Sequence, residues 1–252
     1  MSEEKNLDVE TLKIEGRNAV IEAFRSGKPI DKVFVLDGCH DGPVRTVVRE
    51  AKKHDTILNF VTKERLDQLS ETGKHQGVIA YAAAYEYSEV EDMLELAKKK
   101  GEDPFIIILD NIEDPHNLGA IIRTANLAGA HGVIIPKRRA AGLTAVVAKT
   151  SAGALNYTPV AKVTNIAKTM EELKEKGLWF VCADMGGELM YKMNLTGPIG
   201  LVIGNEGEGV GRLVKEKCDF VASIPMKGDI DSLNASVAAG VLAYEIVRQR
   251  MS

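Results

Sequence analysis

The sequence has few cysteines and few aromatic residues, and both shortages exclude classes of protein. Its three cysteines, Cys39, Cys182 and Cys218, are far apart and form no Cys-x-x-Cys pair. This pattern argues against a disulfide scaffold and a zinc site, and it favours a reducing, cytoplasmic compartment. Aromatic side chains make up 5% of the 252 residues, so the core must be built mainly from Ala, Val, Ile and Leu.

Long hydrophobic runs and an excess of positive charge are also missing. No apolar run approaches the roughly 18 residues that a membrane span requires, and the acidic start MSEEKNLDVE is unlike a signal peptide. The formal net charge is −4, with 32 Lys and Arg against 36 Asp and Glu. This excludes a uniformly basic surface for nucleic acid but not a local basic patch. The five histidines lack metal-ligand spacing, so we expect no metal site. Because no apolar run is long enough to span a bilayer, we also expect no membrane partner.

An acidic segment divides the chain. Residues 87–103 (YSEVEDMLELAKKKGED) hold six acids and three lysines around a short helical pattern, with Gly101 and Pro104 at the end. We interpret the segment as a linker or bridging helix. It would separate an N-terminal domain, residues 1–86, from a C-terminal domain, residues 104–252.

Apolar patterns predict that both domains are α/β. The N-terminal domain is expected to be a small βαβαβ-like unit, with helices over 14–25, 44–54 and 63–70 and strands over 32–36, 56–61 and 77–84. In the C-terminal domain, apolar runs such as FIIILD (105–110) are typical of strands buried on both faces of a parallel sheet. Strands are expected there over 105–110, 132–136, 157–161, 178–184, 200–204 and 220–226, and helices over 118–128, 145–152, 166–176, 210–218 and 235–250. The pattern therefore predicts a mostly parallel sheet with helices on both faces.

The glycine cluster 204–211 (GNEGEGVG) does not fit a dinucleotide-binding fingerprint. The pair Gly207 and Gly209 would need a third glycine at position 212, where Arg212 stands. The sequence also lacks a P-loop and a Gly-x-Ser-x-Gly nucleophile elbow. A nucleotide-dependent oxidoreductase is therefore disfavoured.

Polar residues gather instead in three segments that each follow an apolar strand. They are residues 110–126 (DNIEDPHNLGAIIRTAN), 203–211 (IGNEGEGVG) and 224–236 (IPMKGDIDSLNAS). Because ligands of parallel sheets bind beyond the carboxyl ends of the strands, we expect the three segments to converge at one edge.

The three segments together resemble the SpoU (TrmH-type) branch of the SPOUT methyltransferases. The sequences NLGAIIRTA, VIGNEGEGV and IPM followed by SLNAS carry the resemblance, in this order. The N-terminal sequences IEGRNAV (14–20) and HQGV (75–78) resemble the ribosomal-protein-like substrate-binding domain of bacterial 23S rRNA guanosine 2′-O-methyltransferases. The resemblance implies a C-terminal trefoil knot, a homodimer with the active site near the interface, and S-adenosylmethionine as methyl donor. It places the cofactor against Ile203, Gly204, Ile224, Met226, Ser232 and Leu233.

The resemblance also assigns catalytic roles. Methyl transfer to a ribose 2′-hydroxyl requires that the hydroxyl be oriented and lose its proton. Arg123 is the leading candidate, and since a guanidinium is a very poor base, we expect it to stabilise the forming alkoxide. Asn117 is expected at the N-cap of its helix and as a substrate-orienting amide. Glu206 is expected to hold Arg123 or the cofactor amine, and Asn234 to cap the last helix and bind the cofactor.

Basic residues predict an RNA-binding surface. Lys137, Arg138 and Arg139 form a run beside the expected site, and Arg17, Arg45 and Arg49 supply cations in the N-terminal domain. Tyr81 and Trp179 lie inside strand patterns and are expected in the core rather than against a base. An apolar face on the last helix (Val241, Leu242, Tyr244 and Ile246) is expected in the core or at a dimer interface.

The activity expected from the resemblance is S-adenosylmethionine-dependent 2′-O-methylation of a guanosine in 23S rRNA, free or in a precursor ribosomal particle. Three alternatives remain. The same chemistry could act on tRNA, which the extra N-terminal domain disfavours. The protein could methylate a different rRNA nucleotide, as resistance-type relatives do. It could also be a ribosome-assembly factor without turnover, which the set Asn117, Arg123, Glu206 and Asn234 disfavours.

Overall fold

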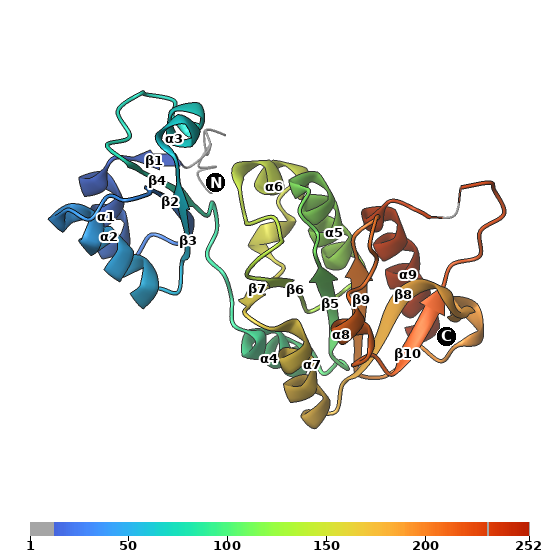
Figure 1. Ribbon diagram of the computed structural model, residues 1–252. Coiled ribbons are helices and arrows are strands. Elements are labelled where there is room, and N and C mark those ends of the chain that lie inside the picture. Colours follow the sequence, from blue (N-terminus) through green and yellow to red (C-terminus); the bar gives the residue numbers. More distant parts are fainter. Residues whose placement is uncertain (1–12, 231, 252) are drawn as a thin grey trace. The chain divides into compact units, whose positions relative to one another are not determined.

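The computed structural model describes residues 13–230 and 232–251, which fall into two compact units (Figure 1). The first unit runs to Glu86 and includes Gly142–Val146. The second comprises Tyr87–Ala141 and the chain from Val147 onward. Each unit has its own sheet.

The first unit is a four-stranded sheet with helices. Its elements are β1 (Lys13–Glu15), α1 (Arg17–Arg25), β2 (Ile30–Leu36), α2 (Gly42–Lys53), β3 (Ile57–Val61), α3 (Lys63–Leu69) and β4 (Val78–Ala82). The strand order is β1-β4-β2-β3, with β2 and β3 parallel and β4 antiparallel to both of its neighbours. In α2, the buried residues Val44, Val47 and Ala51 recur at helical spacing. They pack against Val33 and Val35 of β2 in one core.

The prediction of a helix over 14–25 is wrong at its beginning. Residues 13–15 form strand β1, which pairs antiparallel with β4, and α1 starts only at Arg17. Gly16, with a φ of 97°, separates the two elements. Ile14 packs against the same core as α1, so its apolar character fitted a strand as well as a helix.

The second unit is a six-stranded sheet with the order β10-β8-β9-β5-β6-β7, and all five strand pairs are parallel. The parallel sheet predicted for the C-terminal part is therefore confirmed. The strands are β5 (Phe105–Asp110), β6 (Gly132–Pro136), β7 (Val160–Val163), β8 (Trp179–Leu189), β9 (Ile199–Gly204) and β10 (Phe220–Ser223). Strand β7 lies three residues later than predicted, and β8 continues five residues further.

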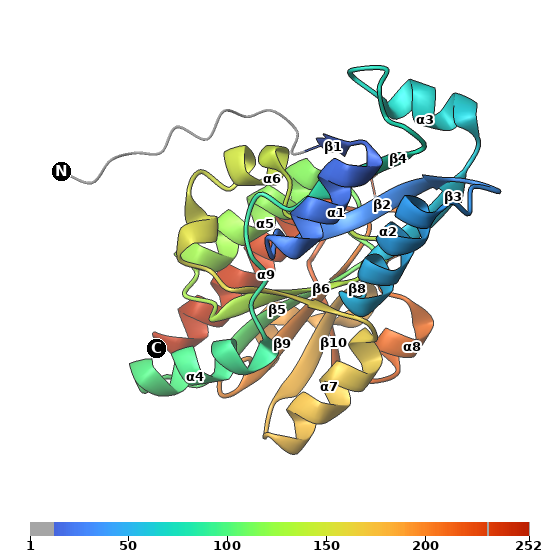
Figure 2. The same cartoon turned by 90° about the vertical axis from the view of Figure 1, so that its left-hand side faces the viewer.

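Helices lie on both faces of this sheet. They are α4 (Val90–Lys100), α5 (Pro115–Leu127), α6 (Ala145–Thr150), α7 (Ile166–Glu175), α8 (Arg212–Lys215) and α9 (Ala235–Arg250), with short 3-10 turns η1 (Ala154–Asn156) and η2 (Met190–Lys192). Figure 2 shows α4 and α7 on one side of the sheet and α5 and α9 on the other. Ile106 and Ile108 of β5 pack on the side of α4 and α7, and strand alternation directs Ile107 and Leu109 to the other.

The segment 87–103, which we interpreted as a linker or a bridging helix, is mainly a helix. Most of it is α4, in which Met93 and Ala97 are fully buried. Met93 joins the core formed with Ile106, Ile134 and Met170. The apolar positions in this acidic segment are therefore one face of a helix that belongs to the second unit.

Among the described helices, none combines the length and the apolar composition that crossing a bilayer would require.

Candidate functional site

A cavity of about 240 Å³ lies at the carboxyl end of β9, in the second unit. It lies between the loop that follows β9, the end of β8 and the segment between β10 and α9. All six residues predicted to contact the cofactor line it: Ile203, Gly204, Ile224, Met226, Ser232 and Leu233. Ala183, Asp184 and Met185 of β8 also line it. Sequence reasoning missed these three, although Asp184 follows the apolar run of a buried strand, as polar site residues often do.

Gly204 brings the backbone of two segments together at this cavity. A Cβ at this position would lie 2.1 Å from the carbonyl carbon of Gly209, so no larger side chain fits. The loop closes because the Gly209 N–H donates to the Asn205 carbonyl at 3.0 Å. The Asn205 side-chain oxygen also accepts from the N–H groups of Gly207 and Glu208. The loop is therefore a compact turn packed on the end of β9.

Three of the four predicted catalytic residues meet at the Glu206 carboxylate. The side-chain amides of Asn117 and Asn234 both donate to Glu206 Oε1, at 2.9 and 2.6 Å. The Ala235 backbone N–H adds a longer bond of 3.2 Å. Asn234 also donates to Asn117 Oδ1 at 3.0 Å. We call Asn117, Glu206 and Asn234 the amide–carboxylate cluster.

Helix ends position this cluster, one of them differently than predicted. Asn234 caps α9 as expected, because its Oδ1 accepts from the Ser236 N–H at 3.0 Å. Asn117 is not an N-cap. Asp114 caps α5 by accepting from the His116 N–H, and Pro115 occupies the first turn, where a missing N–H costs nothing. Asn117 therefore lies inside the first turn, where it is buried.

Arg123 lies apart from the cluster. It is six residues after Asn117 on α5, which corresponds to about 9 Å along the helix axis. Its side chain is exposed, and neither cavity described here includes it among its lining residues.

A second, polar cavity of about 560 Å³ adjoins the cluster. Residues 205–208 line both cavities, so this loop is their common wall. The other lining residues are Asn111, Ile112, Glu113, Asp114, Asn117 and Arg139. Asn111 and Arg139 have positive φ angles of 61° and 56°, a backbone conformation that residues other than glycine rarely adopt. Of the predicted basic run, only Arg139 lines this cavity, whereas Lys137 and Arg138 do not.

An ion pair holds Asp184 at the first cavity. Lys215 Nζ lies 2.7 Å from Asp184 Oδ2. The hydrogen bond from Lys215 lowers the pKa of Asp184, and the Gly186 N–H, which donates at 3.0 Å, lowers it further. Asp184 therefore presents a stable carboxylate to the cavity. Across residues 13–230 and 232–251, no three His, Cys, Asp or Glu side chains form a metal-binding group.

In the first unit, Arg17 is bound within the fold. Its Nε donates to the Gln76 carbonyl at 2.7 Å, and its guanidinium forms an ion pair with Asp41. Arg45 and Arg49 lie on α2, with exposed side chains. Tyr81 lies in β4 with its ring edge-on to Phe34, and Trp179 lies in β8 edge-on to Phe220.

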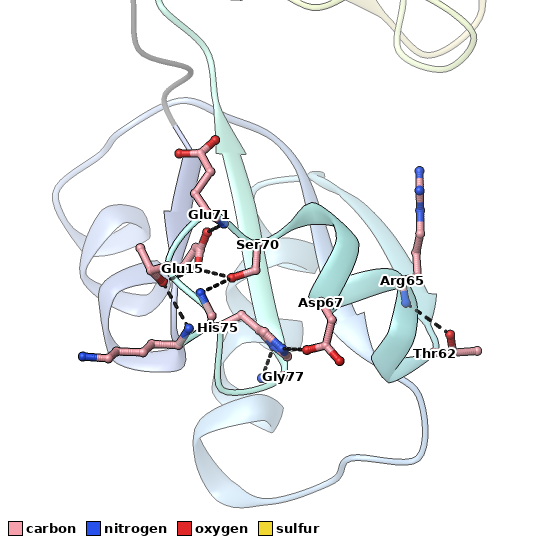
Figure 3. A network of polar contacts seen from close by, with 11 residues as sticks. Glu15, Thr62, Arg65, Asp67, Ser70, Glu71, His75 and Gly77 are labelled. Atoms are coloured by element: carbon pink, nitrogen blue, oxygen red, sulfur yellow. Dashed lines mark hydrogen bonds and ion pairs between the residues drawn. The ribbon is translucent and has the colours of Figure 1, made fainter.

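The loop that carries Gln76 is fixed by buried and charged groups (Figure 3). The Glu15 carboxylate accepts from the Ser70 hydroxyl and the Glu71 N–H, both at 2.6 Å. Desolvation raises the pKa of Glu15, but hydrogen bonds from Ser70, Thr72 and the backbone outweigh it and lower the pKa to about 2. His75 accepts from the Gly77 N–H at 2.9 Å and lies 3.0 Å from Asp67.

Two family models and several curated proteins match this chain. The SpoU rRNA methylase family model matches residues 104–244, and the model for RNA 2′-O ribose methyltransferase substrate binding matches residues 13–88. The chain is 52% identical over 237 residues to YacO of Bacillus subtilis, a putative TrmH family tRNA/rRNA methyltransferase, with 93% of this chain and 94% of that protein covered. A putative TrmH family tRNA/rRNA methyltransferase of Staphylococcus haemolyticus is 46% identical over 243 residues, with 96% and 97% covered.

A solved structure of the same type is also similar. The SpoU methyltransferase AviRb from Streptomyces viridochromogenes, in complex with the cofactor AdoMet, matches with a TM-score of 0.60 at 26% identity. The match covers 95% of this chain and 90% of that one. The chain belongs to the SpoU (TrmH) family of RNA methyltransferases.

Proposed function

We propose that the protein transfers a methyl group from S-adenosylmethionine to the ribose 2′-hydroxyl of a guanosine in 23S rRNA. The observation that carries this proposal is the amide–carboxylate cluster, which lies where the two cavities meet. One cavity would hold the methyl donor and the other the target nucleotide. The match to a 2′-O ribose substrate-binding domain supports ribose as the acceptor.

The residues of the first cavity fit S-adenosylmethionine. Ile203, Ile224 and Leu233 offer apolar walls for the adenine. Gly204 leaves space that a Cβ would fill, and Asp184 is a carboxylate suited to an ammonium or to ribose hydroxyls. The bound cofactor would supply an electrophilic methyl group on a sulfonium. AviRb, at 26% identity, holds this cofactor.

The side chains of this protein would prepare the acceptor hydroxyl. The cluster fixes the Glu206 carboxylate through two amides, so that its remaining acceptor capacity faces the cavities in one orientation. Asn117, in the second cavity, would orient the ribose. Within one chain Arg123 lines neither cavity; brought to the acceptor by a second copy of the chain, it would stabilise the alkoxide while the proton passes to water, because an oriented guanidinium is a strong donor but a very poor base.

We further propose a homodimer with the active site near the interface. Exposed apolar side chains on α5, directly after η1 and on α9 support it. Leu127 is 65% exposed and Tyr157 is 76% exposed, and half of Tyr244 is exposed. Helix α5 contacts both η1 and α9, so a second copy that packs on α5 would cover these side chains. The trefoil knot, the ribosomal-protein-like character of the first unit and the cytoplasmic location stay predictions.

A methyl-transfer assay tests the proposed function. The full-length protein would be incubated with methyl-labelled S-adenosylmethionine and separate unmodified transcripts of 23S rRNA, 16S rRNA and tRNA, and the product would be digested to nucleosides. Label in 2′-O-methylguanosine from 23S rRNA alone is the expected result. Label in tRNA would overturn the substrate but keep the chemistry. Cofactor binding without label on naked RNA would call for the same assay on precursor ribosomal particles, and no cofactor binding would favour the assembly factor.

A further inference from the structure

The first unit contains a groove that the methyl-transfer chemistry does not use. It lies between α2 and β3, has a volume of about 420 Å³ and is apolar at its base and basic along one side. Val44 and Val48 of α2 form the base, and Phe60 of β3 forms the far wall. The remaining lining residues are Cys39, His40, Arg45, Arg49 and Lys52.

The groove arises because α2 leaves the end of an edge strand uncovered. β3 is the outer strand of its sheet, and its residues Leu58 and Phe60 pair with Val33 and Val35 of β2. Residues two apart on a strand point to the same face, so Phe60 points to the same face as Leu58, which packs against the core. Phe60 nevertheless remains 52% exposed. Its ring is therefore a free aromatic surface beside the helix.

The basic side of the groove is a stripe on α2. Arg45, Arg49 and Lys52 follow one another at helical spacing, and the stripe spans about 10 Å along the helix. Arg49 contacts the neighbouring Glu50 at 3.2 Å. Within the part of the chain that the structure describes, Arg45 and Lys52 form no ion pair and no side-chain hydrogen bond. These two exposed cations are therefore free to bind an anionic partner.

We propose that this groove binds a short unpaired segment of RNA, with one base stacked on Phe60 and the adjoining phosphates held by Arg45 and Lys52. An exposed ring beside a row of cations is the combination by which proteins bind single-stranded nucleic acid, since every base has a face that stacks and every linkage carries a charge. The inference rests on the proposed function for the nature of the partner, and it adds a second contact for the substrate. All lining residues belong to the first unit.

The test is the binding of a fluorescein-labelled 12-nucleotide oligouridylate to the full-length protein, followed by anisotropy at several KCl concentrations. Phe60→Ala should weaken binding about 5- to 100-fold, the range expected for one lost stacked base, without changing the slope of log K against log salt. Phe60→Tyr should restore the affinity. The double variant Arg45→Ala with Lys52→Ala should reduce the slope by about 1.4, since each phosphate contact on a single strand contributes about 0.7.

Matched controls come from elsewhere on the surface. Arg65→Ala removes an exposed cation of α3, and Tyr191→Ala removes an exposed aromatic ring of the second unit. Both should bind the oligonucleotide as the unchanged protein does. Circular dichroism melts would show that every variant folds, as expected for side chains on the surface.

Three results would overturn the groove proposal. They are unchanged affinity in Phe60→Ala, an unchanged salt slope in the double variant, and equal competition by oligoglutamate, which has charge but no bases. Oligouridylate binding requires no methyl transfer, so the groove can be established even if the protein modifies no RNA. Conversely, if methylation occurs and Phe60→Ala leaves the KM for RNA unchanged, the groove proposal is wrong while the proposed function stands.

Discussion

The side-chain amide of Asn234 donates to the side-chain oxygen of Asn117 at 3.0 Å, although 117 residues separate the two along the chain. Both amides also donate to the same oxygen of Glu206. The carboxylate is therefore held from two helices, α5 and α9, whose first turns lie together. This arrangement fixes the orientation of Glu206 before any ligand arrives, as preorganised sites do.

Asn117→Ala should lower methyl transfer at least about 10-fold and leave the affinity for S-adenosylmethionine within a few-fold. Asn117 lines the polar cavity but not the first one, so its loss frees Glu206 on the substrate side. Calorimetry with the cofactor and a single-turnover assay would separate the two effects. Asn194→Ala, at an exposed amide outside both cavities, is the control. A cofactor affinity that falls as steeply as the rate would contradict the assignment.

Arg123→Ala should reduce methyl transfer at least about 100-fold while cofactor affinity stays within a few-fold, as expected when an oriented catalytic group is lost. The residue is exposed, so stability should hardly change. Arg212→Ala, another exposed arginine of the second unit, is the matched control. Normal turnover in Arg123→Ala would remove Arg123 from the mechanism.

The convergence of three polar segments could be predicted from the sequence by a simple rule, whereas the individual cofactor and catalytic residues came from the resemblance to the SpoU family. Buried strands of a parallel sheet are apolar throughout and their carboxyl ends meet, so the polar segments after β5, β9 and β10 had to lie together. Local detail was harder to predict. The Asp114–Pro115 pair started α5 earlier than the apolar spacing alone indicated, which placed Asn117 inside the helix. Contacts such as that of Glu15 with Ser70 join residues 55 apart, and no local pattern encodes them.

Leu233→Asp should weaken S-adenosylmethionine binding at least about 10-fold. Leu233 lines the first cavity beside Ile224, and a carboxylate there would lose its hydration against an apolar wall. The cofactor dissociation constant, measured by calorimetry, is the readout. Leu213→Asp makes the same change at an exposed leucine outside the cavity and should bind normally. Unchanged affinity in Leu233→Asp would exclude this loop from the cofactor site.

Gly204→Ala should abolish cofactor binding and destabilise the loop, because the added Cβ would lie 2.1 Å from the carbonyl carbon of Gly209 and the backbone would have to move. Gly228→Ala is the control, since a Cβ there meets nothing within 4 Å. Thermal melts with and without S-adenosylmethionine would compare the two. If Gly204→Ala is stabilised by the cofactor as strongly as the unchanged protein, the loop does not close as described.

The Glu15 carboxylate predicts how the first unit responds to acid. Its pKa falls from 4.5 to about 2 on folding, so its contribution to stability is complete above about pH 4.5 and is lost as the pH falls toward 2. Glu15→Gln removes the charge-assisted hydrogen bonds and should lower the free energy of unfolding of the first unit by about 1–3 kcal/mol at pH 6.

Urea-dependent hydrogen exchange of the amides in β1 and β4, at pH 6 and pH 3, would measure this free energy. The difference between the unchanged protein and Glu15→Gln should shrink at pH 3, whereas Glu86→Gln, at an exposed carboxylate, should show none. If the stability difference between the two proteins stays constant with pH, these hydrogen bonds do not hold the Glu15 carboxylate in its ionised form.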